Sequence, residues 1–339
     1  MTKITRAENC DKASETITTV SVVAAALCIL LTAIPAQLAA QTYPNKPIRL
    51  IVPFPPGGGT DILARIIGQK YSEQLGQPIV PESRPGAAGN IGIEAAARSK
   101  PDGYTMVLSS PTISISPTLF KKISYDPVKD LAPISKVAQT HIVVAVRNGL
   151  PAKSIKEFIA HAKANPGKLL FGSGGAGTST HLATELFKSI AKIDIRHVAY
   201  KGANAALIAM MSNEIDMVFI VMPNVRPHIL DGRVRALAVL SPERVPALPD
   251  VPTIKEAGVE NADVESWYGL FTAAGTPREL LNRLNSEWKK IAAMPDTKEK
   301  MSAAGVEPVW SSQEQLGEFL KVEIARWGKV VKEANISVD

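Results

Sequence analysis

Residues 48–65 read IRLIVPFPPGGGTDILAR, and their pattern indicates the class of fold. The apolar run at 48–54 has the length and composition of a buried strand. Prolines and glycines then break the run, and apolar side chains return at helical spacing: Ile62, Leu63, Ile66, Ile67 and Tyr71. The stretch therefore predicts a strand, a tight loop and a helix, which is the repeating unit of an α/β protein.

The same alternation continues along the chain. Further strands are expected at 105–108, 142–146, 217–221 and 236–240, and further helices at 182–190, 280–291 and 314–334. Strands that alternate with helices favour parallel pairing. We therefore predict an α/β fold in which each sheet is mainly parallel and flanked by helices.

The N-terminus has the order of a secretory signal peptide. Lys3, Arg6 and Lys12 precede an apolar stretch at 17–34, and small residues follow at Ala36, Ala39 and Ala40. A basic segment, an apolar segment and a small-residue cleavage zone predict a signal peptide at 1–40 and export to the periplasm. A retained membrane anchor is the alternative, because the apolar stretch approaches the length of a span.

Cysteine use and charge narrow the function classes. Both cysteines, Cys10 and Cys28, fall in the predicted signal peptide, so the rest of the chain offers no disulfide, thiol nucleophile or thiolate metal ligand. The formal net charge of +6 suits anionic ligands. Basic runs interleaved with aromatic residues do not occur, so nucleic acid is not an expected partner.

Four loops rich in glycine and other small residues follow strand-like runs and open helices. They lie at 55–61, 84–90, 171–179 and 200–204. Small residues let a ligand approach the main chain, and the first turn of a helix leaves N–H groups without partners, which favours anion binding. The loops predict a cleft that holds a carboxylate, with tight strand-to-helix turns as the alternative interpretation of each glycine cluster.

The sequence shows no motif that indicates an enzyme. The segment GSGGAG at 172–177 matches a dinucleotide-binding pattern, but Asp194 stands at the start of the next strand-like run and not at its end. Zinc-protease and nucleophile-elbow motifs do not occur, and the five histidines are scattered. Asp61 and Arg65 are expected to support each other, with Asp61 as a possible N-cap. His181 fits a capping or core role better than a ligand contact.

At these loops the sequence resembles the Bug family, the periplasmic substrate-binding proteins of tripartite tricarboxylate transporters. The matching stretches include FPPGGGTDILAR (54–65), RPGAAGNIG (84–92), GTSTHLATELF (177–187), HVAYKG (197–202) and WYGLFTAAGTP (267–277). The resemblance implies a two-lobed, type II-like periplasmic-binding-protein fold that closes like a Venus flytrap. It places lobe I at 43–141 plus 266–339, lobe II at 142–265, and two crossovers near 140–146 and 264–270.

The resemblance also implies a function without catalysis, cofactor or metal. The ligand is expected to be a small carboxylate, such as an amino acid, a di- or tricarboxylate or an aromatic acid. The partners are expected to be the membrane subunits of a transporter, and the receptor itself a monomer. Two other functions stay open: a ligand-sensing subunit for a membrane signalling protein, and a secreted enzyme.

By position, the first two loops and Ser109-Ser110 would form one wall of the cleft, and the third and fourth loops the other. The expected ligand-binding residues are Phe54, Gly58, Gly59, Thr60, Asp61, Gly86, Ala87, Ala88, Gly89, Ser109, Ser110, Thr178, Ser179, His181, Tyr200, Lys201, Gly202 and Asp216. The sequence departs from the family pattern at Ala205, where proline is common, at Asn213, where glycine is common, and at the bulky pair Met222-Pro223.

Overall fold

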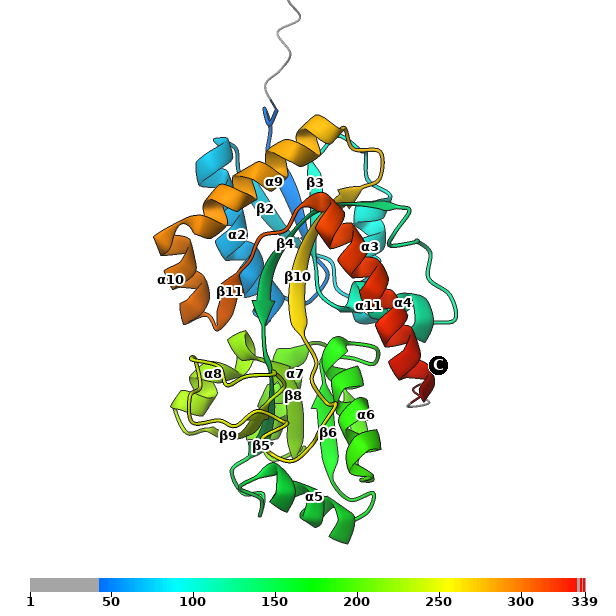
Figure 1. Ribbon diagram of the computed structural model, residues 1–339, viewed down its shortest axis with the longest axis vertical. Helices are drawn as coiled ribbons and strands as arrows, with labels where there is room; N and C mark the ends of the chain where they lie inside the picture. The colour runs from blue at the N-terminus through cyan, green and yellow to red at the C-terminus, as the bar shows by residue number, and fades with distance from the viewer. Residues whose placement is uncertain (1–42, 334–335, 337, 339) are drawn as a thin grey trace, which may run out of the picture. The chain divides into compact units, whose positions relative to one another are not determined.

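Two mixed β-sheets, each flanked by helices, organise the chain from Lys46 onward (Figure 1). The structure is a computed structural model, and it describes residues 43–333, 336 and 338. The predicted signal peptide at 1–40 lies outside these residues. Residues 46–339 form one unit, to which everything below refers.

The first sheet has the strand order β11-β4-β10-β3-β1-β2. Within it β1 pairs in parallel with both β2 and β3, whereas β10 runs antiparallel to β3 and β4, and β11 antiparallel to β4. Its strands are β1 (Ile48–Val52), β2 (Ile79–Ser83), β3 (Thr105–Ser109), β4 (Leu131–Thr140), β10 (Ser266–Ala273) and β11 (Val306–Pro308).

The second sheet has the order β7-β6-β8-β5-β9. In this sheet β6 is parallel to β7 and β8, and β5 is antiparallel to β8 and β9. Its strands are β5 (Ile142–Arg147), β6 (Leu170–Ser173), β7 (Arg196–Ala199), β8 (Met217–Val221) and β9 (Val234–Val239). All five strands predicted from the sequence are present, within two residues at each end.

The expectation that each sheet is mainly parallel is wrong, because both sheets are mixed. Parallel neighbours arise where a helix returns the chain to the same end of the sheet, as α2 (Gly59–Leu75) does between β1 and β2. Strands β5 and β10 enter from the other sheet without such a helix between. Their direction is therefore not constrained by a helical crossover, and they pair antiparallel.

The chain passes twice between the sheets, as the two-lobed fold requires. Only His141 separates β4 from β5, and residues 240–265 lead from β9 back to β10. The carbonyl of His141 accepts a hydrogen bond from the Met222 N–H at 2.9 Å, which ties the first crossover to the second sheet. The division into lobes at 141/142 and 265/266 stays a prediction.

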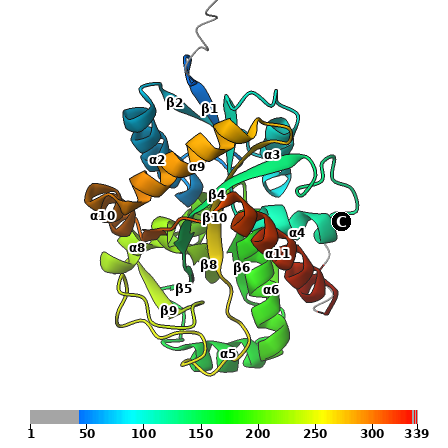
Figure 2. The ribbon, with the colours of Figure 1, turned by 45° about the horizontal axis from the view of Figure 1, so that its top comes forward.

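The helices cover both faces of the sheets (Figures 1 and 2). Each predicted helix is present, and Asn213 takes the left-handed backbone (φ 66°) expected of a residue that replaces glycine. No helix among the described residues is long and apolar enough to span a bilayer. Besides α2 and the short η1 (Ala87–Gly89), the helices are α3 (Asn90–Ala97), α4 (Thr112–Leu119), α5 (Ile155–Ala164), α6 (Ser179–Ala191), α7 (Ala203–Met211), α8 (Met222–Leu230), α9 (Arg278–Ala293), α10 (Pro295–Ala303) and α11 (Gln313–Glu333).

The last helix joins the two halves by its packing. Helix α11 lies beside α4 in both ribbon views. Its C-terminal residues Trp327 and Val331 belong to the same buried cluster as Val144 and Phe171 of the second sheet. Residues 266–339 therefore contribute to the cores on both sides, although β10 and β11 belong to the first sheet.

Two tryptophans give a matched test of this core. The Trp288 side chain is fully buried, its ring stacks on Tyr71 with centroids 5.9 Å apart, and its Nε1 donates to the Val309 carbonyl at 2.7 Å. We expect Trp288→Ala to lower the free energy of unfolding by about 3–5 kcal/mol in a urea titration. Trp310 is 38% exposed, so Trp310→Ala should cost less than about 1 kcal/mol. Equal losses in the two variants would contradict the assignment of α9 to the core.

Candidate functional site

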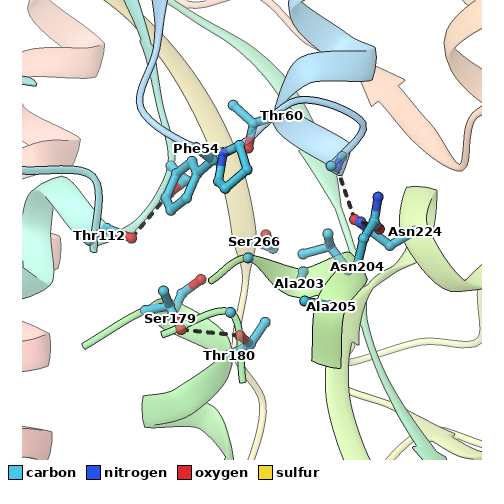
Figure 3. Close-up of a pocket in the computed structure, with 18 of the residues that line it drawn as sticks. Phe54, Thr60, Thr112, Ser179, Thr180, Ala203, Asn204, Ala205, Asn224 and Ser266 are labelled. Carbon is cyan, nitrogen blue, oxygen red and sulfur yellow. Dashed lines mark hydrogen bonds between the residues drawn. The ribbon is translucent and has the colours of Figure 1, made fainter. Parts of the chain in front are cut away.

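A cavity of about 140 Å³ lies where helices from the two sheets face each other (Figure 3). Both halves of the chain contribute to its wall. From the first come Phe54, Pro55, Pro56, Gly58, Gly59, Thr60, Ser110, Thr112, Ser266 and Tyr268, and from the second come Gly174, Thr178, Ser179, Thr180, Lys201, Gly202, Ala203, Asn204, Ala205, Val221 and Asn224.

Three helices begin at this wall. Thr60 lies in the first turn of α2, Ser179 and Thr180 in that of α6, and Ala203 and Ala205 in that of α7. Within the described part of the chain, the backbone N–H groups of these five residues have no hydrogen-bond acceptor. Unpaired first-turn amides, aided by the helix dipole, form sites for anions.

The start of α2 is held in shape by Asp61. Its Oδ2 accepts hydrogen bonds from the Gly57 N–H and from Arg65 Nε, both at 3.0 Å. Gly57 has a positive φ of 79°, which glycine adopts without strain. The N-cap is Gly58, so the expectation that Asp61 caps the helix is wrong. Asp61 supports the loop as predicted, and it is not among the residues that line the cavity.

The start of α6 is pinned by Thr178. Its Oγ1 donates to the Gly175 carbonyl at 2.8 Å and accepts from the His181 N–H, so it is the N-cap of the helix. Gly177 has φ 84°, and a Cβ there would lie 2.8 Å from Cζ of Phe120. The loop therefore runs against the opposite half of the chain, and only glycine fits at this position.

His181 supports this loop from behind and does not line the cavity. Its Nδ1 accepts a hydrogen bond from the Gly177 N–H at 3.2 Å, and its ring stacks on His197 with centroids 4.0 Å apart. Burial, reinforced by repulsion from His197 and Lys188, lowers the pKa of His181 to about 3. Burial, reinforced by Lys188, lowers the pKa of His197 to about 4. Both rings are therefore neutral at physiological pH.

The second predicted loop lies behind Phe54. A Cβ on Gly89 would lie 3.3 Å from Cζ of Phe54, and Ser83 Oγ donates to the Phe54 carbonyl at 2.8 Å. Gly86, Ala87, Ala88 and Gly89 are not among the lining residues. The missing side chain at Gly89 gives the loop room to pack against Phe54, so this loop positions a wall residue. Direct contact of the loop with a ligand stays a prediction.

Three further predicted residues lie outside the cavity wall. The hydroxyl of buried Ser109 donates to the Ser110 carbonyl at 3.3 Å, and the N–H of Tyr200 donates to the Ser173 carbonyl at 3.0 Å. Asp216 accepts from the Leu170 N–H and from Arg147 Nε, both at 2.9 Å. These bonds give Asp216 a structural role at the start of β8.

Nine of the predicted residues do line the cavity: Phe54, Gly58, Gly59, Thr60, Ser110, Thr178, Ser179, Lys201 and Gly202. Sequence reasoning missed other wall residues, among them Thr112, Asn204, Asn224, Ser266 and Tyr268. Asn204 lies in the predicted fourth loop but was not selected there, and the other four come from elements without a glycine-rich loop, such as β10 and α8. The run SSPT at 109–112 places serine and threonine directly at the end of a strand. This pattern could have identified Thr112 as a wall residue.

The electrostatics of the wall favour an anion. Lys201 is the one charged side chain among the described lining residues, and hydroxyl and amide groups supply the rest of the polar surface. Burial raises the pKa of Tyr268 to about 12, so its phenol stays neutral and can donate a hydrogen bond. No group of three or more His, Cys, Asp or Glu side chains in the described residues is placed to hold a metal ion.

Two sheets joined by two crossovers, with a cavity between helix N-termini, define a periplasmic binding protein fold. The model of the tripartite tricarboxylate transporter family receptor (TctC) matches residues 63–336, so the chain belongs to this family of solute-binding receptors. This confirms the resemblance to the Bug proteins. Protein BugT of Bordetella pertussis (strain Tohama I) is 36% identical over 302 residues, which cover 88% of this chain and 93% of BugT.

Solved structures agree with the family assignment. An R. palustris protein determined with adipate superposes with a TM-score of 0.85 at 34% identity, covering 87% of this chain and 99% of that one. MatC from Rhodopseudomonas palustris, determined with bound malate, gives a TM-score of 0.81 at 29% identity, covering 85% of this chain and 100% of MatC.

The stacked histidines predict a pH dependence of stability. Their pKa values in the folded chain lie below the 6.5 of an unfolded histidine. As the pH falls from 6.5 toward 4, the unfolded chain therefore binds more protons than the folded chain. The free energy of unfolding should therefore decrease over this range. Between pH 6.5 and 5 most carboxylates remain ionised, and histidines account for most of the loss.

The variant His181→Phe keeps a ring in the stack and cannot be protonated. We expect its melting temperature to fall less than that of the wild type between pH 6.5 and 5, although its absolute value is lower because the acceptor for the Gly177 N–H is gone. Differential scanning calorimetry at several pH values measures both. Parallel curves for wild type and variant would show that His181 does not carry the pH dependence.

Proposed function

We propose that this protein is a periplasmic receptor that captures a small carboxylate in the cavity and delivers it to the membrane subunits of a tripartite tricarboxylate-type transporter. The observation that carries the proposal is the group of unpaired first-turn amides, from α2, α6 and α7, in the wall of one cavity. A carboxylate oxygen accepts several N–H bonds at once, and helix dipoles favour its charge.

The composition of the wall supports an anion over a cation. Lys201 and the helix starts contribute positive charge, and the hydroxyls of Thr60, Ser110 and Ser179 add donors. The described lining residues include no Asp or Glu, so a cation in the cavity would lack an opposite charge.

The size of the cavity supports a small ligand. Its volume of about 140 Å³ is close to the ~150 Å³ of a cavity known to hold benzene. This suits acids of the class found in the related structures, which hold adipate and malate. Apolar wall residues, such as Phe54 and Val221, would contact the carbon skeleton.

Binding without turnover is part of the proposal. The amides, hydroxyls and one lysine of the wall are enough to hold a carboxylate. His181, next to the lining residue Thr180, lies behind the loop and accepts its hydrogen bond from the Gly177 N–H. In this proposal the predicted signal peptide directs export to the periplasm, where the receptor acts as a monomer.

A ligand panel tests the proposal directly. We expect at least one of malate, adipate, glutamate, citrate and benzoate to raise the melting temperature, because a ligand at a hundred times its Kd adds about 2.7 kcal/mol to stability. Adipamide, the neutral analogue of adipate, should give no shift. A panel of mono-, di- and tricarboxylates without any effect, or equal shifts from adipamide and adipate, would refute carboxylate capture.

A substitution at Ala205 tests the role of the main chain. Ala205→Pro removes one unpaired N–H from the first turn of α7, where proline is tolerated. We expect the Kd of the best carboxylate, measured by isothermal titration calorimetry, to rise about tenfold, since the lost bond involves a charged acceptor. Ala205→Gly keeps the N–H and should stay within about threefold of wild type. Unchanged affinity in a folded Ala205→Pro protein would exclude this amide from the site.

A further inference from the structure

Two asparagine side chains connect the two halves of the molecule at the edge of the cavity (Figure 3). Asn224 Oδ1, from α8, accepts a hydrogen bond from the Gly59 N–H at 3.0 Å. Asn224 Nδ2 donates to Asn204 Oδ1 on α7, and Asn204 Nδ2 donates to the Gly57 carbonyl at 2.6 Å. The main chain at the start of α2 is thus linked through two side-chain amides to α7 and α8.

The backbone partners at the two ends fix how both amides are oriented. The Gly59 N–H requires an oxygen, so Asn224 presents Oδ1 to it and has Nδ2 left for Asn204. The Gly57 carbonyl requires a donor, so Asn204 presents Nδ2 and has Oδ1 left for Asn224. Each asparagine takes part in two of the three bonds, and the bond between them is lost when either one is replaced.

The link is built into tight packing. Asn224 is 6% exposed, and its bond to Gly59 is shielded from water. A Cβ on Gly59 would lie 2.8 Å from Asn224 Oδ1 and 3.2 Å from Cγ2 of Val221. A buried amide without a partner costs free energy, so these groups must be hydrogen-bonded while the gap is closed. When the gap between α2 and α8 opens, water replaces the protein partners.

We propose that Asn204 and Asn224 form a latch that favours the closed cleft and so sets how readily the receptor opens to admit and release its ligand. All donors and acceptors of the latch belong to the protein, so it adds to whatever the ligand contributes to closure. A receptor releases its ligand only through the open form, and a contact made only in the closed form shifts that equilibrium. Asn204 and Asn224 are positioning residues in this scheme.

The latch is distinct from the anion site of the same cavity. It takes up the Gly59 N–H, one of the amides at the start of α2, and leaves the N–H groups of Thr60, Ser179 and Ala205 unpaired. Its effect is therefore on the separation of α2 from α7 and α8, and it can be measured without a ligand. The outcome is independent of the carboxylate titrations above.

Distance measurements by electron paramagnetic resonance test the latch. The full-length sequence carries Cys10→Ser and Cys28→Ser, so that only introduced thiols are labelled, and spin labels are placed at Gln74→Cys on α2 and Lys156→Cys on α5. Both positions are exposed and lie on opposite sides of the cavity. The reference, called the latched chain, is the labelled protein that keeps Asn204 and Asn224. In ligand-free protein with Asn224→Ala, we expect the ratio of long to short distances between the two labels to rise about tenfold over that of the latched chain.

Asn148→Ala is the matched control. Its Nδ2 donates to the Gly232 carbonyl at 2.7 Å, which is the same kind of long-range bond within one half of the chain. The control should keep the distance distribution of the chain with both asparagines, and Asn204→Ala should shift the distribution in the same direction as Asn224→Ala, because it also removes two of the three bonds. Circular dichroism confirms that each variant is folded.

The double variant Asn204→Ala/Asn224→Ala should open further than either single variant, but by less than the sum of the two effects in free energy, because the bond between the two asparagines is lost in each single variant and only once in the double variant. Coinciding distance distributions in the latched chain and in both single variants would overturn the proposal. A double variant whose effect equals the sum of the two single effects would overturn the hydrogen-bonded chain, because the amides would then act separately.

Discussion

The unpaired backbone amide at a helix start is the constraint on which the site depends. A helix cannot satisfy the N–H groups of its first turn internally, and such groups inside a folded chain need water, a side chain or a ligand. In this protein the first turns of α2, α6 and α7 come together in the wall of one cavity. The loops before these helices are rich in glycine because other residues would block the approach of the chain, as at Gly177 beside Phe120.

The rest of the site serves to keep these helix starts in place. Asp61 holds the loop before α2, and Thr178 with His181 holds the loop before α6. The loop at Gly89 supports Phe54 from behind. Family membership and the adipate- and malate-bound relatives fit a site of this kind, in which the main chain supplies the donors and the side chains shape the space. The asparagine latch adds a contact that belongs to closure.

Much of the fold could be predicted from the sequence, because it follows from periodicity. Apolar runs such as 48–52 and 142–147 form the central strands, and the helical stripes that contain Trp288 and Trp327 are core. The pairing direction could not be predicted. Local sequence does not record whether a strand returns through a helix or arrives from the other sheet, and β5 and β10 arrive from the other sheet.

The cavity wall was predicted in part where glycine marked it, and most wall residues on other elements were missed. Thr60 and Ser179 sit in loops with an evident signature, whereas Asn224 and Tyr268 reach the cavity through tertiary packing alone. Asp216 was among the expected ligand-binding residues, but its carboxylate accepts hydrogen bonds from Arg147 and the Leu170 N–H. A glycine-rich loop also has two uses that sequence cannot separate: the loop at 84–90 supports a wall residue, and the loop at 171–179 forms the wall.

The most direct measurement of the central claim is a titration followed by the ¹⁵N and ¹H NMR signals of the backbone amides, with malate and adipate as ligands. We expect the amides of Thr60, Ser179 and Ala205 to shift together, with one common Kd, since a single carboxylate-bearing ligand would accept from helix starts on both sides of the cavity. Saturation with a bound acid that leaves these three signals in place, while amides elsewhere shift, would contradict it.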